Sequence, residues 1–236
     1  GLTGAGQTES TPVGTLATDL VEGKELAEQQ QQEETSNAEA TWNEELELWT
    51  TSKGATGVKG EYDDGYVAGE QTPAQYYFSI DSLTNEISIE YGDSGITTLE
   101  VPSTIDGKNV VSLAGMGSAA LTSVTFAGDS HVRKVGGLGG SSIKEIALPD
   151  SVEELGWNAF YGSKTLQTVT WPNNAAFTTI PEQAFEGCEQ LDDNVVATLP
   201  PSVKTIDYRA FANCGVPQFY VSDTTVLTFT QIDVPG

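Results

Sequence analysis

This 236-residue chain contains one histidine and two cysteines. These are the most versatile side chains in acid, base and nucleophilic chemistry. His131 is the single histidine, so a Ser-His-Asp or Cys-His arrangement would have to use it. It lies in 128–132, whose glycine, aspartate and serine are typical of a turn, and no nucleophile-elbow sequence surrounds it. We interpret His131 as a solvent-exposed turn residue rather than a catalytic one.

Patterns that bind metals or phosphates are also missing from the sequence. One histidine and two distant cysteines do not form the cluster that a zinc site needs. Adjacent carboxylates such as Glu153 and Glu154 face opposite sides of a strand, and the spaced carboxylates of a calcium loop do not occur. The glycine run 136–140 lacks the Lys-Ser/Thr ending of a phosphate-binding loop. We therefore predict no catalytic residue, no metal, no cofactor and no enzymatic activity.

Acidic residues outnumber basic ones by 34 to 10, which gives a formal net charge of −24. Such a surface repels the phosphates of nucleic acids and of anionic membranes. No stretch approaches the roughly 20 apolar residues of a membrane span, and the first residues lack the basic flank and apolar run of a signal peptide. We expect a monomer that neither binds nucleic acid nor inserts into a membrane, with its signal or anchor segment absent from this sequence.

Internal repetition from residue 96 onward is the strongest signal in the sequence. Each unit opens with a short run in which apolar and polar residues alternate, and in several units proline follows. Three units continue to an Ala-Phe pair, at Ala159-Phe160, Ala184-Phe185 and Ala210-Phe211. The opening runs are 96–102, 121–126, 143–149, 166–172 and 216–221, and a degenerate copy ending in 199–203 fills the last interval.

These runs resemble the BspA-type leucine-rich repeat, whose units follow the pattern L-x-x-V-x-I-P-x-S-V-x-x-I-G-x-x-A-F-x-G-C. The resemblance covers about 96–221. It implies a bacterial protein that is secreted or held at the cell surface, because members of that family are commonly extracellular and often linked to adhesion.

The fold follows from the repeat on physical grounds as well. Alternating apolar residues form one face of a short strand, and proline ends the strand because it has no N–H to donate. A single coil cannot bury its apolar face, whereas stacked coils can. We predict a right-handed leucine-rich-repeat solenoid, with a parallel β-sheet on one side and short helical or 3₁₀ turns on the other.

Two units depart from the pattern. The unit that begins at Leu121 carries the glycine run 136–140 in place of the Ala-Phe segment, so we expect its turn side to be short and thinly packed. In the degenerate unit, Asn194 and Ala197 occupy positions that hold isoleucine two copies earlier. We expect a bulge or a shifted register over 192–197.

The acidic first third differs from the repeats, and we divide the chain into an N-terminal linker and helical segment, 1–75, and a solenoid with a hairpin cap, 76–236. Residues 1–18 have linker composition. Trp42 and Trp49 recur with helical spacing in 37–50, after a capping-box pattern at 36–39. We predict a helix there, which either docks on the open end of the solenoid or stays a tether. Alternation around 83–85 predicts a β-hairpin that leads into the first coil.

Binding candidates come from the surface positions of the repeats. Trp157 and Tyr208 occupy the same position in two units, with Glu182 between them and Tyr161 nearby. These aromatic side chains either mark an interface or cover the turn beneath them. The full candidate set adds small polar and aromatic strand positions and is Trp157, Tyr161, Tyr208, Tyr220, Thr168 and Thr170.

The sequence predicts the class of function but not the identity of the ligand. We expect a recognition or adhesion module that binds a protein or glycan on a cell or matrix surface, and the alternative is a structural stalk or spacer that carries other domains.

Cys188 and Cys214 hold one position in two units, which favours two buried thiols, with a disulfide between neighbouring coils as the alternative.

Overall fold

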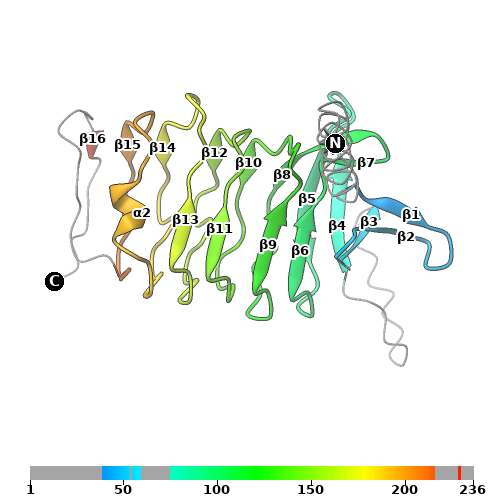
Figure 1. Cartoon of the computed structure of the whole chain (residues 1–236), viewed down its shortest axis with the longest axis horizontal. Helices are drawn as coiled ribbons and strands as arrows, with labels where there is room; N and C mark the ends of the chain where they lie inside the picture. Colours follow the sequence, from blue (N-terminus) through cyan, green and yellow to red (C-terminus); the bar gives the residue numbers. More distant parts are fainter. Residues whose placement is uncertain (1–38, 54, 60–74, 216–227, 230–236) are drawn as a thin grey trace, which may run out of the picture. The chain divides into compact units, whose positions relative to one another are not determined.

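The computed structural model describes residues 39–53, 55–59, 75–215 and 228–229. All of them belong to one compact unit, Ala38–Gly236, in which the chain winds through stacked coils (Figure 1). The predicted linker 1–18 and the acidic stretch that follows it lie outside the described residues. Among the described residues, no helix has the length and apolar character needed to cross a membrane.

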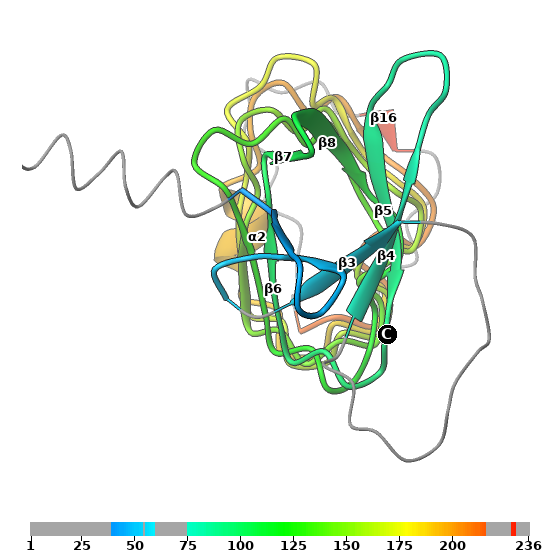
Figure 2. The same ribbon diagram turned by 90° about the vertical axis from the view of Figure 1, so that its right-hand side faces the viewer.

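Each coil contributes short parallel strands to two sides of the solenoid, which appear on opposite sides of the view along the stack (Figure 2). The chain continues from one side to the other through a turn, so neighbouring strands in a sheet come from successive coils. One side holds β6 (Thr98–Val101), β9 (Ser123–Phe126), β11 (Glu145–Ala147) and β13 (Thr168–Thr170). The other holds β8 (Lys108–Leu113), β10 (Lys134–Val135), β12 (Glu154–Leu155), β14 (Thr179–Ile180), β15 (Thr205–Ile206) and β16 (Thr228–Phe229).

Apolar residues stack in register inside the coils. Leu99 pairs with Val124, and Ile146 pairs with Val169. All four are buried, whereas Thr168 and Thr170 on either side of Val169 are exposed. The alternation predicted from the sequence is therefore confirmed, and each core residue lies in a column that runs from coil to coil.

Three phenylalanines form a second column where each coil turns between its two sides. The ring centroids of Phe160 and Phe185 are 5.1 Å apart, and those of Phe185 and Phe211 are 5.2 Å apart, with nearly parallel planes. All three rings are buried. Since the ring spacing is close to the separation of neighbouring strands, the repeated Ala-Phe pair fills the same space in each coil.

The turns around this column are not helical, which corrects the prediction of helical or 3₁₀ turns. Each turn reverses direction at a residue with positive φ, which is Asn158 (56°), Gln183 (54°) or Arg209 (55°) in successive coils. The N–H of Phe160 donates to the carbonyl of Ala184 at 2.7 Å, so it bonds to the next coil. Because main-chain donors are used between coils, no continuous helical hydrogen-bond pattern develops within the turn.

A short helix replaces the strand in the degenerate coil, where we expected a bulge or a shifted register. Helix α2 (Asn194–Ala197) follows Leu191, and the N–H of Asp192 bonds to the carbonyl of Gln167 in the coil before it (2.8 Å). A helix rises about 1.5 Å per residue and a strand about 3.3 Å. The helical turn therefore takes up the extra residues of this unit while Val195 and Val196 stay buried.

Strands, not a helix, occupy the described part of 37–50, so the helix predicted there is wrong. β1 (Thr41–Asn43) and β2 (Leu48–Thr50) form an antiparallel hairpin in which Trp42 lies opposite Trp49. The Asn43 carboxamide oxygen accepts hydrogen bonds from the N–H groups of residues 45 and 46, both at 3.0 Å, and stabilises the turn. A spacing of seven residues fits two helical turns, but it equally fits a cross-strand pair on either side of a four-residue turn.

The hairpin extends the sheet at the N-terminal end of the coils. β2 pairs with β3 (Thr56–Lys59), and β3 runs parallel to β4 (Gln75–Ile80). The hydroxyl of Ser52 donates to the buried carboxylate of Glu100 on β6 at 2.5 Å. These strands therefore cover part of the first coil, and Glu100 is buried beneath them although it is a charged residue.

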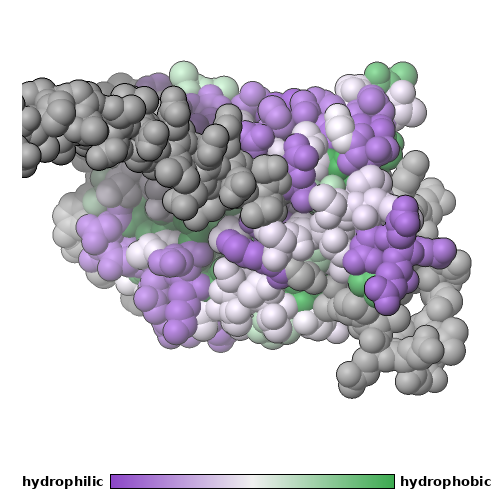
Figure 3. Space-filling model, turned by 45° about the vertical axis from the view of Figure 1, so that its right-hand side comes forward, coloured by the Kyte–Doolittle hydropathy of each residue, from purple (hydrophilic) through white to green (hydrophobic). Residues whose placement is uncertain are grey.

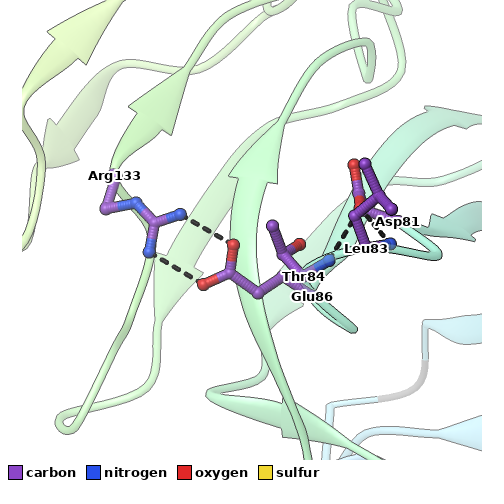
Figure 4. Close-up of polar contacts among 5 residues, drawn as sticks. All are labelled: Asp81, Leu83, Thr84, Glu86 and Arg133. Carbon is purple, nitrogen blue, oxygen red and sulfur yellow. Dashed lines mark hydrogen bonds and ion pairs between the residues drawn. The ribbon is translucent and has the colours of Figure 1, made fainter.

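The hairpin predicted around 83–85 is confirmed as β4 and β5 (Ile87–Gly92). The Asp81 carboxylate accepts hydrogen bonds from the N–H groups of Leu83 (2.7 Å) and Thr84 (2.9 Å), and both contacts lower its pKa (Figure 4). Arg133, next to β10, donates two hydrogen bonds to Glu86, at 3.0 and 2.9 Å. This ion pair links the hairpin to the second coil, because β8 lies between β5 and β10 in the sheet. β7 (Thr104–Ile105) pairs with β8 in an antiparallel arrangement.

Candidate binding surface

Among the candidate aromatic residues that the structure describes, Trp157 and Tyr161 are the most exposed, with 70% and 47% of their surface accessible. Both project from the turn after β12, on either side of the buried pair Ala159 and Phe160. Tyr208 follows at 36%, and the Arg209 guanidinium lies 5.9 Å from the centre of its ring. Side chains that only covered the turn would be more deeply buried than Trp157 is.

Main-chain contacts align the three turns and place Trp157, Glu182 and Tyr208 in one column. The N–H of Asn158 donates to the carbonyl of Glu182 (3.1 Å), and the N–H of Gln183 donates to the carbonyl of Tyr208 (3.0 Å). Thr168 and Thr170 lie apart from this column, on the exposed face of β13. Tyr220 lies outside the described residues. The structure thus brings the aromatic candidates onto the turn side of the coils and leaves the two threonines on a strand face.

An open groove of about 690 Å³ lies beside Tyr161, at a place that the repeat pattern does not mark as a site. Seven of its eleven lining residues are glycines, from the first three coils and the end of β5. The other four are Tyr91, Met116, Asn158 and Tyr161. The glycine run 136–140, which we expected to give a thinly packed turn, forms part of the groove floor, so this signal was present but was assigned to packing alone.

The glycine floor is required by the close approach of neighbouring coils. A Cβ atom on Gly137 would lie 1.8 Å from the carbonyl oxygen of Ala114, and one on Gly117 would lie 2.2 Å from that of Gly139. Gly137 also has a φ of 59°, which side-chain-bearing residues rarely adopt. Side chains are therefore excluded at Gly117 and Gly137, and main-chain groups form the surface there.

Asn158 contributes the amide of the groove. It adopts a φ of 56°, which asparagine tolerates better than most residues. Its side-chain oxygen is buried and accepts no hydrogen bond from the residues that the structure describes. Leaving a buried acceptor without a donor costs about 1–3 kcal/mol.

Two tyrosines and a methionine complete the groove. Tyr91 lies at the end of β5 and stacks on Tyr77 of β4, with ring centroids 4.6 Å apart, so its position is set by the hairpin. Met116 is 3% exposed and packs beneath the surface. Tyr161 alone among these three has a largely exposed side chain.

None of the described lining residues carries a charge, in a chain whose net charge is −24. In the coloured part of Figure 3, hydrophilic and intermediate residues predominate, and hydrophobic residues show between them. A neutral groove on such a chain offers no counter-charge to an ionic ligand. Aromatic, amide and main-chain groups therefore determine what it can bind.

A charged cluster on the later turns links two coils. The Arg209 guanidinium donates to both carboxylate oxygens of Glu186, and the Gln183 amide donates to the same group at 2.7 Å. Glu186 is buried, and its hydrogen bonds from Arg209 lower its pKa despite the opposing effect of burial. Because both oxygens are engaged within the protein, this carboxylate links two coils.

The residues examined for catalysis lie apart from the groove. His131 is exposed in its turn, as predicted. Cys188 is buried, which raises its pKa to about 12, and its thiol donates to the carbonyl of Phe160 at 3.2 Å. Cys214 is half-buried, and both cysteines are free thiols. Within the described ranges, no group of three or more histidine, cysteine or carboxylate side chains is placed to hold a metal ion.

Comparisons with known proteins agree with the repeat pattern. Residues 117–231 match six copies of a family model described as BspA type leucine rich repeat region. Among solved structures, the chain is similar to a leucine-rich repeat protein from Bacteroides ovatus, with 14% identity over 68% of this chain and 60% of that chain and a TM-score of 0.35.

A leucine rich cell surface protein from Faecalibacterium prausnitzii also matches, with 16% identity over 68% of this chain and 54% of that chain and a TM-score of 0.27. The chain therefore spans less than two thirds of either structure. No curated protein sequence matches it.

Proposed function

Since this chain carries a BspA-type leucine-rich-repeat region over 117–231, we propose that it is a non-catalytic extracellular recognition module. It binds a protein or a glycan on a cell or matrix surface through the turn side of its coils. The family resemblance supports the extracellular location, because members of that family are commonly exported or held at the surface of bacteria.

The observation that carries this proposal is the exposure of Trp157 and Tyr161 on one turn, where Tyr161 also lines the groove. A large aromatic side chain in water loses the free energy that burial would supply, about 25 cal/mol for each Å² of apolar surface. Aromatic residues are also enriched where proteins bind their partners. Two such residues on one turn, held in place by coil-to-coil hydrogen bonds, form a rigid surface that is prepared for contact.

A non-catalytic role agrees with the chemistry of the described residues. The described lining residues of the groove include no carboxylate, histidine or cysteine, which are the side chains most often used in acid–base and nucleophilic catalysis, and this supports the proposal. Tyr161 and Asn158 suit contact and hydrogen bonding instead.

A glycan and protein array probed with the intact chain tests this function. We expect reproducible binding to at least one class of extracellular ligand, weakened by the Trp157→Ala substitution and unchanged by Leu83→Ala. Leu83 is 94% exposed at the tip of the β4–β5 hairpin and serves as the control for removal of an exposed apolar side chain. No binding across the array would contradict recognition and favour the structural stalk.

A further inference from the structure

We propose that the groove beside Tyr161 binds a neutral saccharide, so that the chain recognises uncharged glycan. This inference rests on the proposed recognition function and specifies its ligand class. It follows from three properties of the groove, which are the absence of charge among its described lining residues, its main-chain floor and its exposed tyrosine.

The absence of charge excludes ionic ligands first. Phosphate, sulfate and carboxylate groups are bound in proteins by arginine, lysine or clustered N–H donors, and none of the described lining residues is basic. The chain carries a net charge of −24, which adds repulsion for anions. A cationic ligand would need a carboxylate in the groove, and the described lining residues include none.

The floor disfavours peptide ligands. A peptide that adds a strand needs unpaired main-chain groups at a sheet edge. Here the main chain is already paired from coil to coil, since the N–H of Gly117 donates to Gly137 (2.6 Å) and that of Gly140 donates to Tyr161 (2.8 Å). An amphipathic helix needs an apolar groove, but Met116 is the single aliphatic side chain among the described lining residues, and it is buried.

A sugar ring matches what remains. Its C–H face is apolar and packs on an aromatic ring, while its hydroxyl groups both donate and accept hydrogen bonds around the rim. Tyr161 offers the exposed ring, and Asn158 lines the groove beside it. The volume, about 690 Å³, lies within the range of small-molecule sites. Because the groove is open, it can accept units within a longer chain.

Two variants test the site. Tyr161→Ala removes the aromatic ring. Gly140→Asn adds a side chain at the groove, where a Cβ atom meets nothing within 4 Å. The φ of Gly140 is 70°, and the equivalent position in a later coil is Asn213 with a φ of 52°, so asparagine fits this backbone.

Gly107→Asn is the matched control. Gly107 has a φ of 67° and open space around its Cβ position, but it lies in the turn between β7 and β8, outside the groove. The intact chain and its variants are titrated with neutral tetrasaccharides of glucose, mannose and galactose, with heparin and hyaluronan oligosaccharides, and with a neutral Gly/Ser-rich peptide. Thermal unfolding of each variant confirms that it folds.

We expect at least one neutral tetrasaccharide to bind, with affinity reduced by about tenfold or more in Tyr161→Ala and Gly140→Asn and unchanged in Gly107→Asn. Neutral binding that survives both groove variants would overturn this site. Binding of heparin, hyaluronan or the peptide without any neutral saccharide would overturn the ligand class and leave recognition intact. Absence of binding to every probe and to the array would overturn recognition as well.

Discussion

At the residue scale, Glu186 provides a contact between coils whose strength depends on pH. Its pKa in the folded protein is lowered by Arg209, so it contributes stability above its unfolded pKa of about 4.3, and this contribution is lost as the pH falls through the lower folded value. We expect Glu186→Gln to lower the urea midpoint at pH 7 and the difference from the parent to close toward pH 3.

The control for this prediction is Glu189→Gln. Glu189 pairs with Lys164 at 2.7 Å, but more than half of each side chain is exposed, so this pair contributes little to stability. We expect the Glu189→Gln variant to have the same urea midpoint as the parent at pH 7 and at pH 3. An equal effect of the two substitutions would show that the burial of Glu186 does not matter.

The two cysteines give a second prediction at this scale. The raised pKa of Cys188, about 12, and its burial make its thiol unreactive at pH 8, whereas Cys214 is half-buried. We expect alkylation of the folded protein to leave Cys188 unmodified and alkylation in denaturant, without a reductant, to add two labels. Intact mass provides the measurement, and a mass without any label would establish a disulfide instead.

At the scale of the element, strand β13 tests the register of the coils. Val169 is 6% exposed and pairs with Ile146, whereas its neighbour Thr170 faces solvent. Val169→Asp buries a charge without a partner, and we expect it to cost several kcal/mol, on the order of 3–5. Thr170→Asp places the same charge on the exposed face and should change stability by less than about 0.5 kcal/mol. Similar melting curves for the two variants would contradict this register.

The coils could be predicted from the sequence because their signals repeat. Alternation at Leu99, Val124, Ile146 and Val169 recurs in successive units, and each copy reinforces the others. Segments that occur once lacked such support. Trp42 and Trp49 fit a helix and a hairpin equally well, and the turn at Asn43 decided between them.

The candidate site was only partly predictable. The exposure of Trp157, Tyr161 and Tyr208 agrees with their selection from the repeat pattern. The groove could not be predicted because its floor is formed by glycines. A glycine run shows where side chains are absent, but it does not show which residues of neighbouring coils surround that space. The contact between the Gly137 Cβ position and Ala114, which explains that glycine, exists only once the coils are stacked.

At the scale of the whole molecule, the strands before the first coil protect an exposed sheet edge. β3 pairs with β4, so its removal would leave the main-chain groups of β4 open on that side. We expect deletion of residues 1–59 to lower the melting temperature by several degrees and to cause association that increases with concentration. Scattering and thermal unfolding measure both effects, with deletion of 1–18 as the control. A stable, monomeric 60–236 fragment would contradict a capping role.

Recognition through the turn side of the coils is the central claim, and one comparison tests it most directly. The intact parent chain and the Trp157→Ala/Tyr161→Ala double variant are applied to the same immobilised glycans and extracellular proteins. Both residues are exposed, so the variant should keep the parent's melting temperature within a few degrees. The account predicts that binding of the parent falls by about tenfold or more in the variant. Equal binding by the two proteins would contradict it.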